Sequence, residues 1–344
     1  MRFQIRPRVA VCLAVLFSAA LAPSPLAAQE TTATPAATPP AHRARIVRPG
    51  VNTPGISRSM ADIKKDAVFT IPGSPDWSVV TADSLWVTTG RDSHIVQLVA
   101  ATNTLGKVLP VKDPCSGVAI AFGSLWSPSC GDHVLTRFDP ADGKIIAQIP
   151  ANPANSEGGI TVGDGSIWLV TKPSTLVRID PAKNAVIASI PLPSGSENPL
   201  FSDGFVWISS YEHNQLLKVD PASASVVATI PIGPKPRFLT TGAGSIWTLN
   251  QGDGTISRVD EKTSKLIANI ACGIPGFGGE ITFGAGRVWA TMFDFPITEI
   301  DPATNKVVKQ WGGPGGDGLR FGLGSLWLSN GRQGTVWRLS PDQP

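Results

Sequence analysis

The chain has 344 residues, of which 29 are Lys or Arg and 26 are Asp or Glu, so its formal net charge is +3. Arg2, Arg6 and Arg8 lie in the N-terminal segment, and without them 26 basic residues stand against 26 acidic ones. Because no clustered basic excess remains, the sequence excludes a typical nucleic-acid-binding protein.

The first 28 residues have the pattern of a secretory signal peptide. A basic start precedes an apolar run over residues 9–21, and small residues at 27–28 provide a cleavage site. The run is too short for a comfortable membrane span, and no other segment approaches about twenty uninterrupted apolar residues. We therefore expect a periplasmic or secreted protein with no membrane span after cleavage; an uncleaved anchor is the alternative.

Residues 29–64 differ in composition from the rest of the chain. Residues 31–41 are almost wholly Thr, Ala and Pro, and three Arg follow at positions 43, 45 and 48. Such a segment cannot bury a core, so we expect a disordered, solvated linker. A tether to a surface or polymer is the functional alternative.

From residue 65 to the C-terminus, a Trp recurs about every 40 residues in similar contexts, as in Gly165–Trp168 and Gly244–Trp247. The recurring residues are Trp86, Trp126, Trp168, Trp207, Trp247, Trp289 and Trp327. Each interval has room for four short strands, and four strands per 40-residue repeat is typical of a β-propeller blade. We expect these Trp side chains to pack between neighbouring blades.

A turn follows most of these Trp residues at a constant distance. It reads Asp-Pro at 139–140, 180–181, 220–221 and 301–302, and Asp-Glu at 260–261. An Asp at the first turn position can accept a hydrogen bond from the backbone two residues later, and Pro presets φ. Four residues after the turn starts stand Asn103, Gly143, Asn184 and Asn305, residue types that tolerate the left-handed conformation of a hairpin loop.

The two ends of the repeat region complement each other. The last repeat stops after its third strand, near residue 339, whereas an extra strand ending in Ile71-Pro72 precedes the first Trp repeat. The sequence therefore predicts an all-β, seven-bladed β-propeller over residues 65–344, with four antiparallel strands per blade. Its N-terminal strand, residues 67–72, should close the last blade and cover an edge.

These recurring elements resemble the bacterial YVTN-type and virginiamycin B lyase-like (streptogramin lyase-like) propellers over about residues 66–341. The resemblance implies the seven-bladed fold. It also implies a possible activity, because streptogramin lyases use His and Glu at the channel mouth with a magnesium ion to open a cyclic depsipeptide. Their repeats often read Trp-Phe-Thr-Glu. Here the residues three after each Trp are Thr89, Ser129, Thr171, Ser210, Asn250, Met292 and Asn330, and none is Glu.

One face of the predicted propeller collects charged side chains. The loops that link successive blades should meet the loops between the second and third strands on one face, around the central channel. Alignment on the Trp places one group of charged residues near this mouth: Asp76, Glu157, Glu197, Arg237, Glu280 and Asp317. Converging carboxylates can bind a cationic ligand or a hard ion such as Mg²⁺ or Ca²⁺, with Glu197, Glu280 and Asp317 as possible ligands. The alternative is a water-filled mouth of solvated acids.

Three of the four His residues and the only Tyr fall in loops on the same face. They are His94, His133, His213 and Tyr211. We count them as candidate ligand-binding residues and name His213 and Glu280 as candidates for acid–base catalysis. They do not form a three-His zinc motif, and the sequence contains no nucleophile elbow, P-loop or dinucleotide-binding fingerprint.

Two functions remain open. The first is an exported, non-catalytic module that binds a small polar or cationic ligand, or an envelope protein, through the channel-mouth face; we expect it to be a monomer. The second is a metal-dependent lyase or lactone-type hydrolase. The missing Glu after each Trp favours the first.

A disulfide is predicted between Cys115 and Cys130. Cys115 lies seven residues before Phe122 and Cys130 seven residues after Gly123, so the two should face each other across a hairpin that turns at 122–123. An exported location is oxidising. The closed loop is short, so we expect a stabilisation of about 2–3 kcal/mol. Cys272 is left as a small buried thiol.

Overall fold

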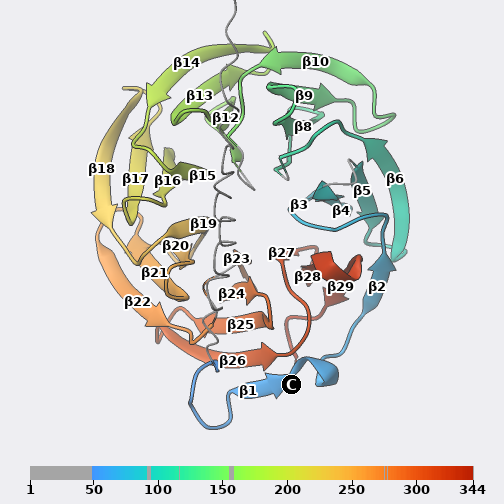
Figure 1. Cartoon of the computed structure of the whole chain (residues 1–344), viewed down its shortest axis with the longest axis vertical. Coiled ribbons are helices and arrows are strands. Elements are labelled where there is room, and N and C mark those ends of the chain that lie inside the picture. Colours follow the sequence, from blue (N-terminus) through green and yellow to red (C-terminus); the bar gives the residue numbers. More distant parts are fainter. Residues whose placement is uncertain are drawn as a thin grey trace, which may run out of the picture. The chain divides into compact units, whose positions relative to one another are not determined.

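A computed structural model describes residues 49–343 except 91–93, 116, 155–158, 275 and 277. The predicted signal peptide and the first part of the predicted linker therefore lie outside the described residues. Apart from two short 3-10 turns, the elements are β-strands, grouped in seven sheets that follow one another in a ring (Figure 1).

Each sheet contains one blade of four antiparallel strands, which we call a to d from the centre outwards. Blade 1 contains β3 (Ser78–Val80), β4 (Ser84–Thr88), β5 (His94–Val99) and β6 (Thr104–Pro110). Blade 2 contains β7 (Ala119–Ala121), β8 (Ser124–Ser129), β9 (Val134–Phe138) and β10 (Ile145–Pro150). Blade 3 contains β11 (Ile160–Gly163), β12 (Ser166–Thr171), β13 (Thr175–Asp180) and β14 (Ala185–Pro191). Blades 4 and 5 contain β15 (Ser196–Ser202), β16 (Phe205–Ser210), β17 (Gln215–Asp220) and β18 (Ser225–Pro231); and β19 (Pro236–Gly242), β20 (Ser245–Asn250), β21 (Thr255–Asp260) and β22 (Leu266–Ala271). The seven-bladed propeller predicted from the repeats is confirmed.

Blade 7 closes the ring as predicted. Blade 6 contains β23 (Glu280–Gly284), β24 (Arg287–Met292), β25 (Phe295–Asp301) and β26 (Lys306–Gly312), and blade 7 contains β27 (Gly318–Gly322), β28 (Ser325–Asn330) and β29 (Thr335–Leu339). Strand d of blade 7 is the N-terminal β2 (Ala67–Thr70), which pairs antiparallel with β29. The two ends of the repeat region are thus held in one sheet.

Within the described residues, regular secondary structure starts before residue 65, the predicted start of the propeller. β1 (Ser57–Ser59) pairs in parallel with β26 as a fifth strand of blade 6, and a 3-10 turn, η1 (Met60–Asp62), follows it. Met60 and Ile63 are buried against the Trp311 and Trp337 rings. Apolar residues at 60 and 63 give this segment side chains to bury, unlike the Thr/Ala/Pro stretch before it.

The recurring Trp residues fill the spaces between blades. Trp168, for example, packs against Val206, Ile208 and Leu217 of the next blade. Its indole N–H donates to the carbonyl of Gly163, the last residue of strand a, and four other Trp donate in the same way. Gly163 is required because a Cβ there would lie 1.9 Å from the Phe201 ring of the next blade.

The Asp-Pro turns form as predicted and also join the blades. Asp180 Oδ1 accepts a hydrogen bond from Ala182 N–H at 2.8 Å, and Asn184 has a φ of 51°. The Asn184 side chain also accepts a hydrogen bond from Arg137 of the preceding blade at 2.9 Å. Arg338 makes the same bond to Asn103 at 2.8 Å, so this contact also ties blade 7 to blade 1.

The predicted disulfide is present, although the register argument behind it holds only near the turn. Ala119 pairs with Trp126 as expected, but farther out Pro114 pairs with Ser129, a shift of two residues. Cys115 and Cys130 therefore meet diagonally across the hairpin, with their Cα atoms 5.5 Å apart. Cys272 is free and buried, as expected.

Candidate functional site

The loops between blades (d–a) and the loops between strands b and c lie on one face, which we call the site face. Tyr211 N–H, in a b–c loop, donates to Gly195 O in the d–a loop of the same blade at 2.8 Å. Gln251 N–H donates to Lys235 O in blade 5 at 2.9 Å. The predicted site residues therefore belong to one end of the channel, on loops that the rigid blades position.

A cavity of about 310 Å³ lies in the channel beneath the site face. It is lined by inner-strand residues of six blades: Trp77, Ser78, Val79, Val80, Val118, Ala119, Ile120, Ile160, Thr161, Val162, Asn198, Pro199, Leu200, Leu239 and Arg320. Most of these side chains are aliphatic, and Arg320 is the one charged residue in the lining. A mainly apolar cavity with a few polar groups is the usual composition of a small-molecule site.

Two aromatic rings meet at the site-face end of this cavity. Trp77 comes from blade 1 and Phe238 from blade 5, and their ring centroids lie 6.0 Å apart at an interplanar angle of 37°. Phe238 is 1% exposed, and Trp77 is half-buried. Because the two blades are not neighbours in the ring, this contact crosses the channel. We call Trp77 and Phe238 the aromatic bridge.

Each ring of the aromatic bridge carries an arginine, and each arginine pairs with a glutamate. Arg320 lies 4.6 Å from the Trp77 ring centroid, and its Nη2 donates to Glu280 Oε1 at 3.2 Å. Arg237 lies 5.0 Å from the Phe238 ring centroid, and its Nε is 3.1 Å from Glu197 Oε2. The charges keep both guanidinium planes close to the rings, where cation–π attraction adds to the pairing.

Glu280 is the more constrained of the two acids. It is 3% exposed, and its second oxygen accepts a hydrogen bond from Leu319 N–H at 2.8 Å. Arg320 is held from a third side, because its Nε donates to Ser78 O at 3.1 Å. A buried carboxylate with these partners serves first to fix Arg320 and Trp77 in place.

Two other predicted mouth residues, Asp76 and Asp317, also lie in loops of the site face. Asp76 N–H donates to Thr88 O at 2.9 Å. The Asp317 carboxylate lies close to Gly331, where an added Cβ would be 2.5 Å from Oδ2. Glu157 lies outside the described residues. Of the predicted mouth residues, Glu197 and Arg237 therefore form an ion pair, and Glu280 pairs with Arg320, which was not among the predicted residues.

The His and Tyr candidates come from three blades, and only Tyr211 and His213 share a loop, the one between β16 and β17. His133 and His213 are exposed, and Lys235 Nζ lies 5.5 Å from the Tyr211 ring centroid. Ser194 Oγ lies 3.3 Å from His213 Nε2, but its hydroxyl donates to Glu212 at 2.7 Å. This is not a nucleophilic triad, because the carboxylate binds the Ser and not the His. No described contact joins His213 to Glu280, the other catalytic candidate.

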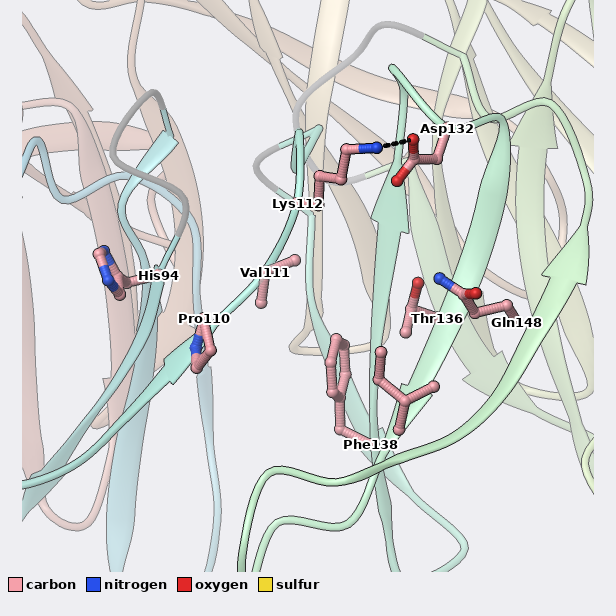
Figure 2. Close-up of a pocket in the computed structure, with 9 residues that line it drawn as sticks. His94, Pro110, Val111, Lys112, Asp132, Thr136, Phe138 and Gln148 are labelled. Atoms are coloured by element: carbon pink, nitrogen blue, oxygen red, sulfur yellow. Dashed lines mark hydrogen bonds and ion pairs between the residues drawn. The ribbon is translucent and has the colours of Figure 1, made fainter.

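His94 lines a separate hollow of about 410 Å³ between blades 1 and 2 (Figure 2). Figure 2 shows Phe138 and Val111 along its wall and the Lys112–Asp132 ion pair, with an N–O distance of 2.6 Å, at one end. This hollow is removed from the channel, so His94 does not contribute to the same site as the aromatic bridge.

A smaller hollow of about 230 Å³ lies on the site face between blades 6 and 7. Asp294, Gly315, Gly316 and Asn330 are among its lining residues. Asn330 is 1% exposed, and its side-chain oxygen accepts a hydrogen bond from Gly316 N–H at 3.0 Å. Asn330 is also the residue three after Trp327, so the departure from the Trp-Phe-Thr-Glu pattern falls at this hollow.

Sequence alignment missed the aromatic bridge by one residue. The residues ten before each Trp were compared, whereas Trp77, Asn198, Phe238 and Glu280 all stand nine before their Trp. Arg320 stands seven before Trp327, where the other blades hold Val79, Ala119, Thr161, Leu200, Thr240 and Thr282. An arginine among small and aliphatic residues was the available signal.

Two further observations concern the described residues alone. None of their helices is long and apolar enough to cross a membrane. No group of three or more His, Cys, Asp or Glu side chains within residues 49–343, the undescribed positions aside, is arranged to hold a metal ion.

Comparison with known proteins supports the fold. No protein-family model matches the sequence, and neither does any curated protein. A solved structure described as "Streptogramin B lyase structure" superimposes with a TM-score of 0.66 over 78% of this chain and 94% of that chain, at 19% sequence identity. At this identity the likeness concerns architecture. The chain is a seven-bladed β-propeller with the fold of streptogramin B lyase.

Proposed function

We propose that the protein is an exported ligand-binding module that uses the site face of its propeller. The ligand is a small molecule whose apolar part enters the channel cavity while a polar group meets Arg320 or Asn198. The aromatic bridge above the cavity is the observation that carries this proposal, because it joins two distant blades through side chains that the repeat does not require.

The chemistry of the cavity supports this ligand class. Aliphatic walls offer water few hydrogen-bond partners, so an apolar group can replace that water at little cost. Glu280 and Glu197 are already paired with arginines, so the site is not a simple cluster of acids that calls for a cation. The electron-rich Trp77 ring and the Arg320 guanidinium favour a planar ligand with an acceptor group.

Calorimetry with three probes tests the proposal: benzoate, indole and benzylamine, which share an aromatic body and differ in charge. We expect one-to-one binding of benzoate or indole. Ala119→Leu, which fills the cavity, should weaken binding about tenfold or more, equivalent to about 1.4 kcal/mol. Ala121→Leu on the same strand is the matched control, because Ala121 does not line the cavity.

Two results would reject this function. One is binding that Ala119→Leu leaves unchanged, which would place the site elsewhere. The other is no binding of any of the three probes. The double variant Glu197→Gln with Glu280→Gln, titrated with Mg²⁺ and Ca²⁺, separates the alternatives: stoichiometric ion binding by the wild type that this variant loses would favour a metal site at the mouth.

A further inference from the structure

A short stretch of the chain lies in the gap between blades 5 and 6. Gly50 N–H donates to Gly273 O, in the loop after β22, at 2.8 Å, and Val51 N–H donates to Gln310 Oε1 of β26 at 2.9 Å. The Val51 side chain packs against the apolar cluster that the two blades share. Residues 50–51 are thus bound as a peptide between two blades, mainly through their backbone N–H groups.

Gln310 is the side chain that holds this peptide. It is 2% exposed, and its Nε2 donates to Cys272 O at 2.9 Å and to Thr298 Oγ1 at 3.0 Å. A side-chain amide has both a donor and an acceptor, so Oε1 remains for the Val51 N–H. Gln310 therefore bridges three partners: the preceding blade, the neighbouring strand of its own blade, and the peptide.

Only blade 2 repeats this pair of Thr and Gln. Thr298 of β25 stands opposite Gln310 of β26, and Thr136 of β9 stands opposite Gln148 of β10 in the same register. The pairs at these two positions in the other blades are Val96 and Val108, Val177 and Ser189, Leu217 and Thr229, Ser257 and Asn269, and Val336 and Phe69. Of these, the polar pair of blade 5 already has a partner across its gap, because Ser257 Oγ accepts a hydrogen bond from Gly233 N–H at 3.0 Å.

The gap beside Thr136 and Gln148 is the hollow of about 410 Å³ between blades 1 and 2, and both side chains line it (Figure 2). Val111 lines it too, and it directly follows strand d of blade 1, as Cys272 follows strand d of blade 5. No described residue occupies this gap in the way that residues 50–51 occupy the other. The Gln148 side chain is exposed and has no hydrogen bond to a described residue, whereas Gln310 is buried.

The apolar floor of the two gaps differs in the same direction. Val307 is 7% exposed and belongs to the cluster against which Val51 packs, whereas Ile145, at the same register position of blade 2, is 57% exposed. Val186 and Leu266, at this position in blades 3 and 5, are also exposed, at 37% and 40%. Exposure here is therefore common in blades without a bound peptide, and the Thr and Gln pair beside a hollow is what sets blade 2 apart.

We propose that the hollow between blades 1 and 2 binds a short peptide segment of a partner protein, as the gap between blades 5 and 6 binds residues 50–51. Gln148 Oε1 accepts a peptide N–H, its Nε2 donates to Val111 O, and an apolar side chain of the peptide covers Ile145. Gly50 has a φ of 83°, in the left-handed region that favours glycine. The recognised segment is therefore a Gly followed by a β-branched apolar residue, as Gly50 precedes Val51.

A capped peptide with the sequence of residues 49–56 tests this proposal, titrated into the full chain and followed by NMR of Ile and Val methyl groups. We expect shifts of the Ile145 methyls with a Kd of about 1 mM, because a short peptide loses conformational freedom on binding. Gln148→Leu keeps a similar size without the amide and should weaken binding about tenfold or more. Ser189→Leu, at the same position of blade 3, is the matched control and should change nothing. The peptide carrying Gly50→Leu should also bind about tenfold more weakly.

The outcomes separate this site from the channel cavity. Ala119→Leu, which fills that cavity, should leave peptide binding unchanged, so the two proposals can fail independently. Absence of Ile145 shifts at about 10 mM peptide would overturn the inference, and so would binding that Gln148→Leu leaves unchanged. Shifts of Val307 in place of Ile145 would also overturn it, because the peptide would then only be exchanging with residues 50–51.

Discussion

Glu280 and Glu197 make the same pair with an arginine in different surroundings, which allows a matched test. Glu280→Gln keeps the size of the side chain but leaves Arg320 without its counter-charge. The Glu280 side chain is 4% exposed and that of Arg320 is 20% exposed. Breaking a buried ion pair on one side costs about 3–5 kcal/mol. Because Arg320 keeps Ser78 O and some solvent, we expect the lower end, about 3 kcal/mol.

Glu197→Gln is the control. The side chains of Glu197 and Arg237 are 26% and 21% exposed, so solvent screens the pair and the expected loss is about 1 kcal/mol or less. Urea unfolding followed by Trp fluorescence measures both free energies of unfolding. Equal losses in the two variants, or a loss below about 1 kcal/mol for Glu280→Gln, would refute the view that Glu280 anchors Arg320.

Four further predictions concern the scaffold. Replacing both Cys115 and Cys130 by Ser should lower the free energy of unfolding by about 3 kcal/mol for a 15-residue separation, measured against the oxidised wild type in denaturant; an unchanged midpoint would contradict it. Phe69→Ala, which removes a 4% exposed ring that contacts Trp327, should cost about 3–5 kcal/mol, whereas Val68→Ala, at a 53% exposed position, should cost about 0.5 kcal/mol or less. Burial raises the pKa of Cys272 to about 12, so a thiol reagent at pH 8 should label it only in the unfolded protein. Burial also raises the pKa of Glu299 above its ordinary value of 4.5, so the folded state binds this proton more tightly than the unfolded state. The free energy of unfolding of the wild type should therefore fall, relative to that of Glu299→Gln, as the pH rises from about 4.5. A difference in melting temperature between the two proteins that stays constant from about pH 4 to 7 would contradict this.

The repeats predicted the fold well because each recurring residue has a local task. The Trp fills a gap between blades, and the Asp binds backbone N–H groups of its own turn, as Asp220 Oδ1 does with Ala222 N–H at 2.9 Å. The Asn of the turn has a second partner that local reasoning did not reach. Its contact with an Arg of the preceding blade spans 47 residues, as between Arg258 and Asn305. Only the arrangement of blades shows that this Asn also joins them.

The residues at the channel mouth were harder to predict because they differ from blade to blade and do not follow the repeat. Side chains alternate along an inner strand, so an alignment shifted by one residue selects the neighbours of the residues that matter. Glu280 was found because it is acidic, while Trp77 and Phe238 at the same level were passed over as apolar. The residue types were therefore less informative than the position nine before each Trp.

The pairing at the mouth follows from how blades stand beside one another. Both ion pairs join neighbouring blades, Glu197 with Arg237 across blades 4 and 5 and Glu280 with Arg320 across blades 6 and 7. The two residues of each pair are 40 positions apart in the sequence, which is one repeat length, so the partner of each acid lies in the next blade. An acid in a propeller mouth is therefore best compared with the residues of the next repeat. From the sequence alone, this comparison pairs Glu197 with Arg237 and Glu280 with Arg320, so the charges of these two acids are balanced. It also points to Trp77 and Phe238, the rings that the two arginines cover.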